Sequence, residues 1–321
     1  VWSAARKRYS PDEKRSVAEW ERNFALLFRK GKSGAREDDC VLMGCNQWLN
    51  PVVTHTEILS GVGLAGSRSF CCGEPYYRAG MLDRAEEIFR RSASLLSSCR
   101  ARRLVVFCPA CFNMFANVYP KLLGKGPGVE LVSLPRWLLT RIKSGKIRLR
   151  RKLGMKAWLQ KNCHCAPLGE GFHDDVREIL SAAGVRVEET KGGGFRCCGL
   201  GAGASRQSAA DCFGHVAKYL RELPVRDVVS YCNGCVVTLG FAELIPLAGF
   251  RVFHLMDVVS MAAGGTPVRK HASRGALLLA AEPAVFASAL VSSGFVYLTR
   301  AFRRDERVPR RIGFHAQTLH L

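Results

Sequence analysis

Residues 1–37 lack an apolar run of the kind that a signal peptide needs and are rich in charge, so we expect no secretory leader. This absence argues against an oxidising compartment, where many cysteines would build a disulfide framework. The 321 residues include 14 cysteines, and these fall in tight clusters. Clustered cysteines in a chain of this length favour metal ligation in a reducing compartment. We therefore predict a cytoplasmic protein, with association at the cytoplasmic face of a membrane as an open alternative.

Acidic residues are scarce as well, and the net charge is +21. The segment from Arg136 to Lys161 contains ten basic residues and no acidic one. Such a balance suits an acidic protein, anionic lipid or nucleic acid as a partner, and equally a solvated linker and tail. The apolar stretch 275–298 is long enough to span a bilayer, although Glu282 and Pro283 lie inside it. A membrane span and a helix that docks on a membrane partner are both hypotheses for it.

Nicotinamide and flavin motifs are also missing. The stretch 199–203 (GLGAG) superficially looks like a nucleotide-binding loop, but it directly follows two cysteines and has no acidic residue in a βαβ context after it. We therefore expect any electrons that the chain handles to come from partner subunits.

The cysteines that are present form an internal repeat. The segment 70–80 (FCCGEPYYRAG) recurs at 196–206 (RCCGLGAGASR), and 105–115 (VVFCPACFNMF) recurs at 228–240 (VVSYCNGCVVTLG). A further cysteine precedes each pair of motifs, Cys45 in the first half and Cys165 in the second. Each half therefore contains Cys…Cys-Cys-Gly…Cys-x-x-Cys in the same order, and duplication of one module is the simplest account.

Strand and helix patterns alternate along both halves. Short β-branched runs at 40–44, 103–108 and 227–232 predict strands that end beside a cysteine. Helical spacing predicts helices over 77–99 and 203–223, and a helix closed by Gly184 within 174–190 that is followed by a strand. This alternation predicts an α/β fold of two tandem pseudo-symmetric cysteine-rich modules, each a small parallel sheet flanked by helices.

We divide the chain accordingly into five segments. They are a helical and basic N-terminal segment (1–38), a first module (39–135), a basic linker (136–160), a second module (161–262) and a basic and apolar C-terminal tail (263–321).

Two adjacent cysteines followed by glycine favour a polynuclear metal centre. Thiolates select iron–sulfur clusters, zinc or Cu(I), and five cysteines per half exceed the four that a tetrahedral zinc ion or a cubane cluster needs. Neighbouring thiolates on one short loop chelate a single ion poorly, but they readily bind neighbouring iron atoms of one cluster. The glycine lets the backbone fold closely over that cluster.

The duplicated pattern, with flanking segments such as CCGEPYYRAGMLDRAEE and CPACFNMFANVYP, resembles the CCG or cysteine-rich domain found in the B and D subunits of heterodisulfide reductases. The resemblance covers residues 40–262 and extends to iron–sulfur subunits of related respiratory systems. In that family each complete motif binds a noncubane [4Fe–4S] cluster, and paired clusters cleave a disulfide in one-electron steps. The resemblance thus implies an oxidoreductase subunit of anaerobic respiration with two noncubane [4Fe–4S] clusters near the interface of the two halves.

Site residues follow from the resemblance, motif by motif. The usual histidine after the second-half ligand is replaced by Ala166, Cys163 is an alternative to Cys165, and no catalytic side chain is assigned. The reaction site is expected beside the cluster near Cys197, Cys198 and His164. The first cluster would be held by Cys45, Cys71, Cys72, Cys108 and Cys111, and the second by Cys165, Cys197, Cys198, Cys232 and Cys235.

The expected partners are a ferredoxin-like, flavoprotein or membrane cytochrome subunit, with a small-molecule or protein disulfide as substrate. We do not expect nucleic acid as a partner. The competing hypothesis is a basic zinc protein without a redox role that binds nucleic acid or a partner. It accounts for the charge and for two CxxC pairs, but not for the repeated Cys-Cys-Gly motifs.

Overall fold

A computed structural model describes residues 39–44, 56–60, 62–65, 72–78, 81–97, 101–188, 198, 222–243 and 249–265. The predicted N-terminal segment, most of the helix predicted over 203–223 and the apolar stretch 275–298 lie outside these residues. Three of the expected ligands, Cys45, Cys71 and Cys197, lie outside them too. Within the described ranges, no helix combines the length and the apolar character that a bilayer crossing requires.

The first half of the structure runs from β1 to α9. Where one long helix is predicted over 77–99, the structure has the end of α5 at Arg78 and the amphipathic α6 over Leu82–Ser97, with residues 79 and 80 outside the described ranges. In chain order the elements are β1 (Asp39–Leu42), η1 (Glu57–Leu59), β2 (Gly63–Ala65), α5 (Glu74–Arg78), α6 (Leu82–Ser97), β3 (Arg103–Val106), α7 (Pro109–Asn113), the π-helix η2 (Met114–Val118), α8 (Tyr119–Leu123), β4 (Glu130–Ser133) and α9 (Leu134–Lys143).

The second half runs from β5 to α13. The predicted helix within 174–190 is α10, and Gly184, with φ +75°, ends it in the left-handed conformation before β6, as predicted. The elements are β5 (Met155–Leu159), η3 (Cys163–Leu168), α10 (Gly171–Ala182), β6 (Val185–Glu188), β7 (Asp227–Ser230), α12 (Asn233–Glu243), β8 (Arg251–His254) and α13 (Leu255–Ala262).

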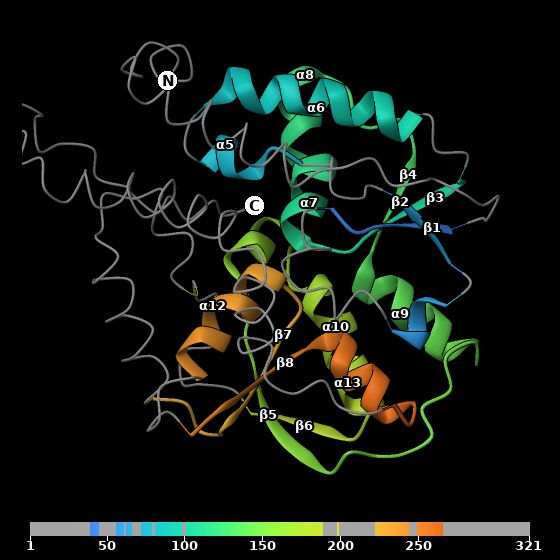
Figure 1. Cartoon of the computed structure of the whole chain (residues 1–321), viewed down its shortest axis with the longest axis vertical. Coiled ribbons are helices and arrows are strands. Elements are labelled where there is room, and N and C mark those ends of the chain that lie inside the picture. The colour runs from blue at the N-terminus through green and yellow to red at the C-terminus, as the bar shows by residue number, and fades with distance from the viewer. Residues whose placement is uncertain are drawn as a thin grey trace, which may run out of the picture.

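The two halves have the same sheet topology. The first sheet has the order β2-β1-β3-β4 and the second β6-β5-β7-β8, and every strand pair is parallel. In both halves the first strand along the chain lies between the second and the third, and the fourth lies beyond the third. The structure therefore confirms the predicted pair of small parallel sheets. Parallel strands are covered on both faces, and Figure 1 shows α6 on the outer side of the first sheet and α9, α10 and α13 between the two sheets.

One hydrophobic core is shared by both halves. Val41 and Val105 of the first sheet belong to the same buried cluster as Ile179 of α10 and Val258 of α13. Alternate residues of β3, such as Leu104, point instead to a second cluster under α6. An ion pair also connects the two halves, since Arg136 of α9 lies 2.9 Å from the buried carboxylate of Asp175 of α10. The halves thus pack as one body.

The segment predicted as a linker, 136–160, contains most of α9 and all of β5. Its apolar residues, among them Trp137 and Leu138, enter the shared core, whereas its basic side chains other than that of Arg141 stay exposed. Two of these basic side chains cap helix ends, since Arg151 Nε donates to the Met261 carbonyl at 2.8 Å and Lys152 Nζ to the Ala182 carbonyl at 2.7 Å. Basic groups at helix C-termini interact favourably with the helix dipole, which accounts for part of the local charge.

A buried tyrosine fixes the turn after the first Cys-Cys pair. The hydroxyl of Tyr119 donates to the Cys72 carbonyl at 2.7 Å and lies 2.9 Å from the Ala85 carbonyl. Gly73 has φ +76°, and a Cβ there would clash with the Tyr119 hydroxyl and lie 3.2 Å from the Ala85 carbonyl oxygen. The glycine of the motif is therefore required for both its backbone conformation and its close approach to α6.

We predict that Gly73→Ala lowers the free energy of unfolding by about 3 kcal/mol, from left-handed strain plus overpacking. Gly124→Ala is the matched control, because Gly124 has φ +66° but nothing within 4 Å of the position that the added methyl group would take. The control should lose only about 1 kcal/mol. Urea unfolding of both variants measures the difference, and equal losses would show that the contact with Tyr119 is unimportant.

Candidate metal centre

The described cysteines of the Cys-x-x-Cys motifs lie where parallel strands end and helices begin. Cys108 follows β3 and precedes α7, whose first turn carries Cys111. Cys232 follows β7 and precedes α12, whose first turn carries Cys235. The carboxyl edge of a parallel sheet is the usual place for a binding site in α/β folds, and helix N-termini stabilise thiolates.

Thiols from the two halves meet in one continuous row. Cys72 contacts Cys111, which contacts Cys108, and Cys108 in turn contacts Cys232 of the second half. The row continues through Cys235 to Cys198. All six side chains are buried, and none is in a disulfide. Because Cys108 and Cys232 each follow a central strand, their contact shows that the carboxyl edges of the two sheets face each other.

The thiols of the row differ in the direction in which their pKa values are shifted. Contacts with Cys111 and Cys232 lower the pKa of Cys108, which makes it the preferred site for negative charge. Contact with Cys108 raises the pKa of both Cys111 and Cys232, and contact with Cys198 raises that of Cys235. A row of buried thiols that cannot all ionise together has a strong requirement for cationic partners.

Cys165 is less exposed to solvent than any thiol of the row. Its side chain is fully buried, and burial raises its pKa to about 12. The Tyr231 hydroxyl and the Asn162 side chain face its sulfur and partly oppose that shift. Cys108 is close enough to Cys165 to affect its pKa electrostatically, so Cys165 stands beside the junction of the two halves. Cys163, the alternative candidate, is partly exposed.

Strand register relates the two halves residue by residue. Cys40 pairs with Leu104 in the first sheet, and Trp158 pairs with Val228 in the second. Since Leu104 and Val228 each lie four residues before the first cysteine of a Cys-x-x-Cys motif, Trp158 is the counterpart of Cys40. Counting five residues onward from each gives Cys45 and Cys163. The register therefore matches Cys163 with Cys45, whereas burial favours Cys165.

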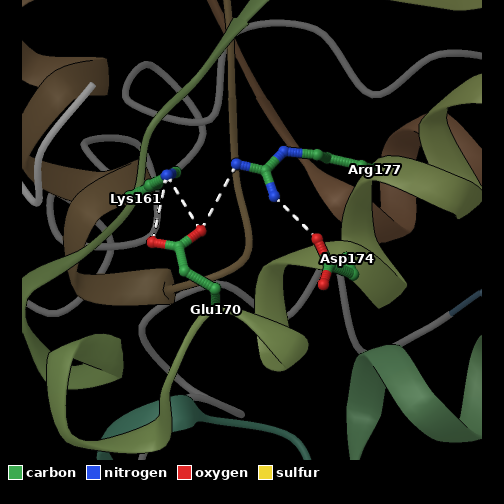
Figure 2. Close-up of polar contacts among 4 residues, drawn as sticks. All are labelled: Lys161, Glu170, Asp174 and Arg177. Carbon is green, nitrogen blue, oxygen red and sulfur yellow. Dashed lines mark hydrogen bonds and ion pairs between the residues drawn. The ribbon is translucent and has the colours of Figure 1, made fainter. Parts of the chain in front are cut away.

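An ion-pair network braces the loop that carries both cysteines (Figure 2). Lys161 Nζ lies 3.2 and 3.1 Å from the two carboxylate oxygens of Glu170, which also accepts a bond of 3.5 Å from Arg177. Arg177 Nη1 also donates to Asp174 Oδ1 at 2.8 Å. The ammonium of Lys161 lowers the pKa of Glu170. The network closes the loop at both ends, because Lys161 precedes η3 and Glu170 follows it.

His164 reaches from the second half toward the first. Its Nδ1 lies 3.7 Å from a carboxylate oxygen of Glu74, the residue that follows the first Cys-Cys-Gly motif. His164 also affects Cys108 electrostatically and lowers its pKa. The structure thus brings His164 close to the row of thiols. Sequence analysis missed Glu74, Tyr119 and Tyr231 as neighbours of the site, because each has a contact there with a residue far away in the chain: His164, Cys72 and Cys165, respectively.

The donor chemistry of the site fits an iron–sulfur group. The site contains buried thiols that form no disulfide. Beside these thiols, the Tyr231 hydroxyl and the side-chain amides of Asn162 and Asn233 have no hydrogen bond of regular geometry within the described residues. Such groups suit the inorganic sulfide and cysteine sulfur of a cluster. In the part of the chain that the structure describes, no three Cys, His, Asp or Glu side chains surround the position of a single metal ion.

Several reductase subunits and proteins named as iron–sulfur proteins are similar to this chain. It is 27% identical over 183 residues to the D chain of the dihydromethanophenazine:CoB–CoM heterodisulfide reductase of Methanosarcina barkeri, covering 52% of this chain and 44% of the relative. It is 27% identical over 199 residues to the B chain of the fumarate reductase (CoM/CoB) of Methanothermobacter marburgensis, covering 60% and 38%. An uncharacterized iron–sulfur protein of Methanocaldococcus jannaschii is 26% identical over 172 residues, covering 51% and 32%. The chain thus spans less than half the length of these relatives.

The duplicated motif is matched by a family model. The model of the cysteine-rich domain named CCG matches residues 53–116 and again residues 158–240. The first match takes in Cys71, Cys72, Cys108 and Cys111, and the second takes in Cys163 to Cys235. Together with the repeated sheet topology, these matches show that each half of the chain is similar to the CCG cysteine-rich domain.

Proposed function

We propose that this chain is the iron–sulfur subunit of an oxidoreductase that couples electron transfer to disulfide/dithiol chemistry through two noncubane [4Fe–4S] clusters. The observation that supports this most directly is the buried row of thiols that crosses from one half of the chain to the other at Cys108 and Cys232. The named activities of the heterodisulfide reductase and fumarate reductase relatives support the same class of function.

The residues that would hold the clusters are those of the two motifs. Those for the first cluster are Cys45, Cys71, Cys72, Cys108 and Cys111, and those for the second are Cys197, Cys198, Cys232 and Cys235 with Cys163 or Cys165. We favour Cys163, because strand register matches it with Cys45. Cys165 is then an additional buried thiol beside the second site.

Bound clusters would supply single electrons, two of which cleave one disulfide. The chain itself excludes water from the thiols, holds the two ligand sets against each other at Cys108 and Cys232, and fixes the loop after β5 through Lys161 and Glu170. A ferredoxin-like, flavoprotein or membrane cytochrome subunit would deliver the electrons. The reaction balances as R–S–S–R′ plus two electrons and two protons giving R–SH and R′–SH.

Metal content is the first test. Anaerobically purified protein should contain about eight iron atoms per chain with matching acid-labile sulfide, four for each cluster. Cys108→Ala should lower this to about four, because one ligand set is broken. Cys40→Ala is a matched control that should keep all the iron, since Cys40 and Cys108 are equally buried at 8% exposure but Cys40 lies within β1. Zinc without sulfide would overturn the proposal in favour of the basic zinc protein.

The ligand in the loop after β5 is tested by a second pair of variants. We predict that Cys163→Ser loses about four iron atoms and that Cys165→Ser keeps its full content. Inductively coupled plasma measurement of iron and zinc on the same samples, with circular dichroism to compare folding, decides between them. Loss of iron from Cys165→Ser but not from Cys163→Ser would assign the ligand to Cys165 instead.

Disulfide chemistry is tested with the loaded chain and a viologen donor. Reduced methyl viologen should be oxidised by a small aliphatic disulfide, and two thiols should be released for each two viologens consumed. Cys108→Ala should lose most of this activity, whereas Cys40→Ala should keep it. Oxidation of viologen by fumarate or a quinone without thiol release from the disulfide would contradict the proposed substrate class and leave an electron-carrier role.

A further inference from the structure

The two sites differ at equivalent positions. The Cys-x-x-Cys motifs align Phe107 with Tyr231 and Pro109 with Asn233, with one offset of 124 residues. The structure bears out this alignment, because β3 ends at Val106 and β7 ends at Ser230, the same 124 residues apart. The second half therefore has a hydroxyl and an amide where the first half has a phenyl ring and a proline ring.

The second site is surrounded by buried polar groups. Tyr231, Asn162 and Asn233 are 1%, 0% and 1% exposed. Tyr231 interacts electrostatically with both Cys165 and Cys232, and its hydroxyl faces the Cys165 sulfur. The Tyr231 hydroxyl and both amide groups have no hydrogen bond of regular geometry to another described residue. Burying such groups is costly unless they find an acceptor.

At the two equivalent positions the first site has the apolar side chains of Phe107 and Pro109. Phe107 stacks on the His254 ring with centroids 5.3 Å apart and an angle of 8° between the planes. Pro109 has no N–H to donate. The nearby hydroxyl of Tyr119 already donates to the backbone carbonyl of Cys72 and lies 2.9 Å from that of Ala85. Among the described residues, these side chains therefore offer the first site no counterpart of the second site's donors.

We propose that Tyr231, Asn162 and Asn233 donate hydrogen bonds to sulfur atoms at the second site and so raise the reduction potential of its cluster above that of the first. This inference rests on the proposed function. A reduced cluster carries one more negative charge, so donors to its sulfurs stabilise the reduced form, and more strongly in a buried, low-dielectric site. Electrons would then pass from the first half to the second across the contact between Cys108 and Cys232.

The test is a redox titration monitored by electron paramagnetic resonance. A Cys72→Ala/Cys111→Ala background removes first-half ligands only, so the remaining signal belongs to the second cluster. In that background Tyr231→Phe, which installs the aromatic side chain of the first half, should lower the midpoint potential. Asn233→Ala should shift it in the same direction. Tyr119→Phe is the matched control, because it also removes a buried hydroxyl but one that faces Cys72, and it should leave the potential unchanged.

The outcomes separate this inference from the function on which it rests. Two clusters with equal potentials in the unmodified chain, or unchanged potentials in both Tyr231→Phe and Asn233→Ala at full iron and sulfide content, would overturn the inference alone. Absence of iron and sulfide from the unmodified protein would overturn both. If Tyr231→Phe fails to assemble a cluster, the midpoint potential of Asn233→Ala still tests the inference. A lower potential supports it, and an unchanged potential overturns it.

Discussion

The contact between the Cys108 and Cys232 thiols is the constraint on which the arrangement of the molecule depends. Each cysteine follows a central strand of its own sheet, so the contact requires the two carboxyl edges to face each other. Two small sheets of four strands would each leave such an edge exposed to solvent. Facing them instead removes the thiols from water, and the shared core of Val105, Ile179 and Val258 maintains that arrangement.

Burial of so many thiols makes it costly for them to ionise unless a cation lies beside their sulfur atoms. Desolvation is the largest of the effects that together raise the pKa of Cys165 to about 12, and the thiols of the row perturb one another in opposite directions. Cationic iron, if bound by these thiols, would reverse this penalty, because a metal favours the deprotonated form of each ligand. The helix N-termini at α7 and α12 act in the same direction. The same features that make the metal-free site costly therefore make it a strong site for a cluster.

Much of this architecture could be predicted from the sequence, because duplication is visible in the spacing of residues. The repeat predicts two equal sheets, and β1, β3 and β7 lie where β-branched runs end beside a cysteine. Side chains that connect distant segments carry no such local signal. His254 caps α13 through Nδ1 and stacks on Phe107 of the other half, while Tyr119 holds a turn 47 residues away. Likewise, spacing alone left Cys163 and Cys165 as alternatives, and only strand pairing relates Cys163 to Cys45.

Duplication also explains why the differences between the halves are informative. Two copies that began alike share topology, strand register and the position of Cys-x-x-Cys, so a change at an equivalent site is not required by the fold. Phe107 and Tyr231 both lie between a strand and a thiol, and both are almost fully buried at 1% exposure. A phenyl ring satisfies that packing, and the hydroxyl adds only a polar group that needs an acceptor. Since packing does not require the hydroxyl, its place beside Cys165 and Cys232 is better explained by the chemistry of the second site.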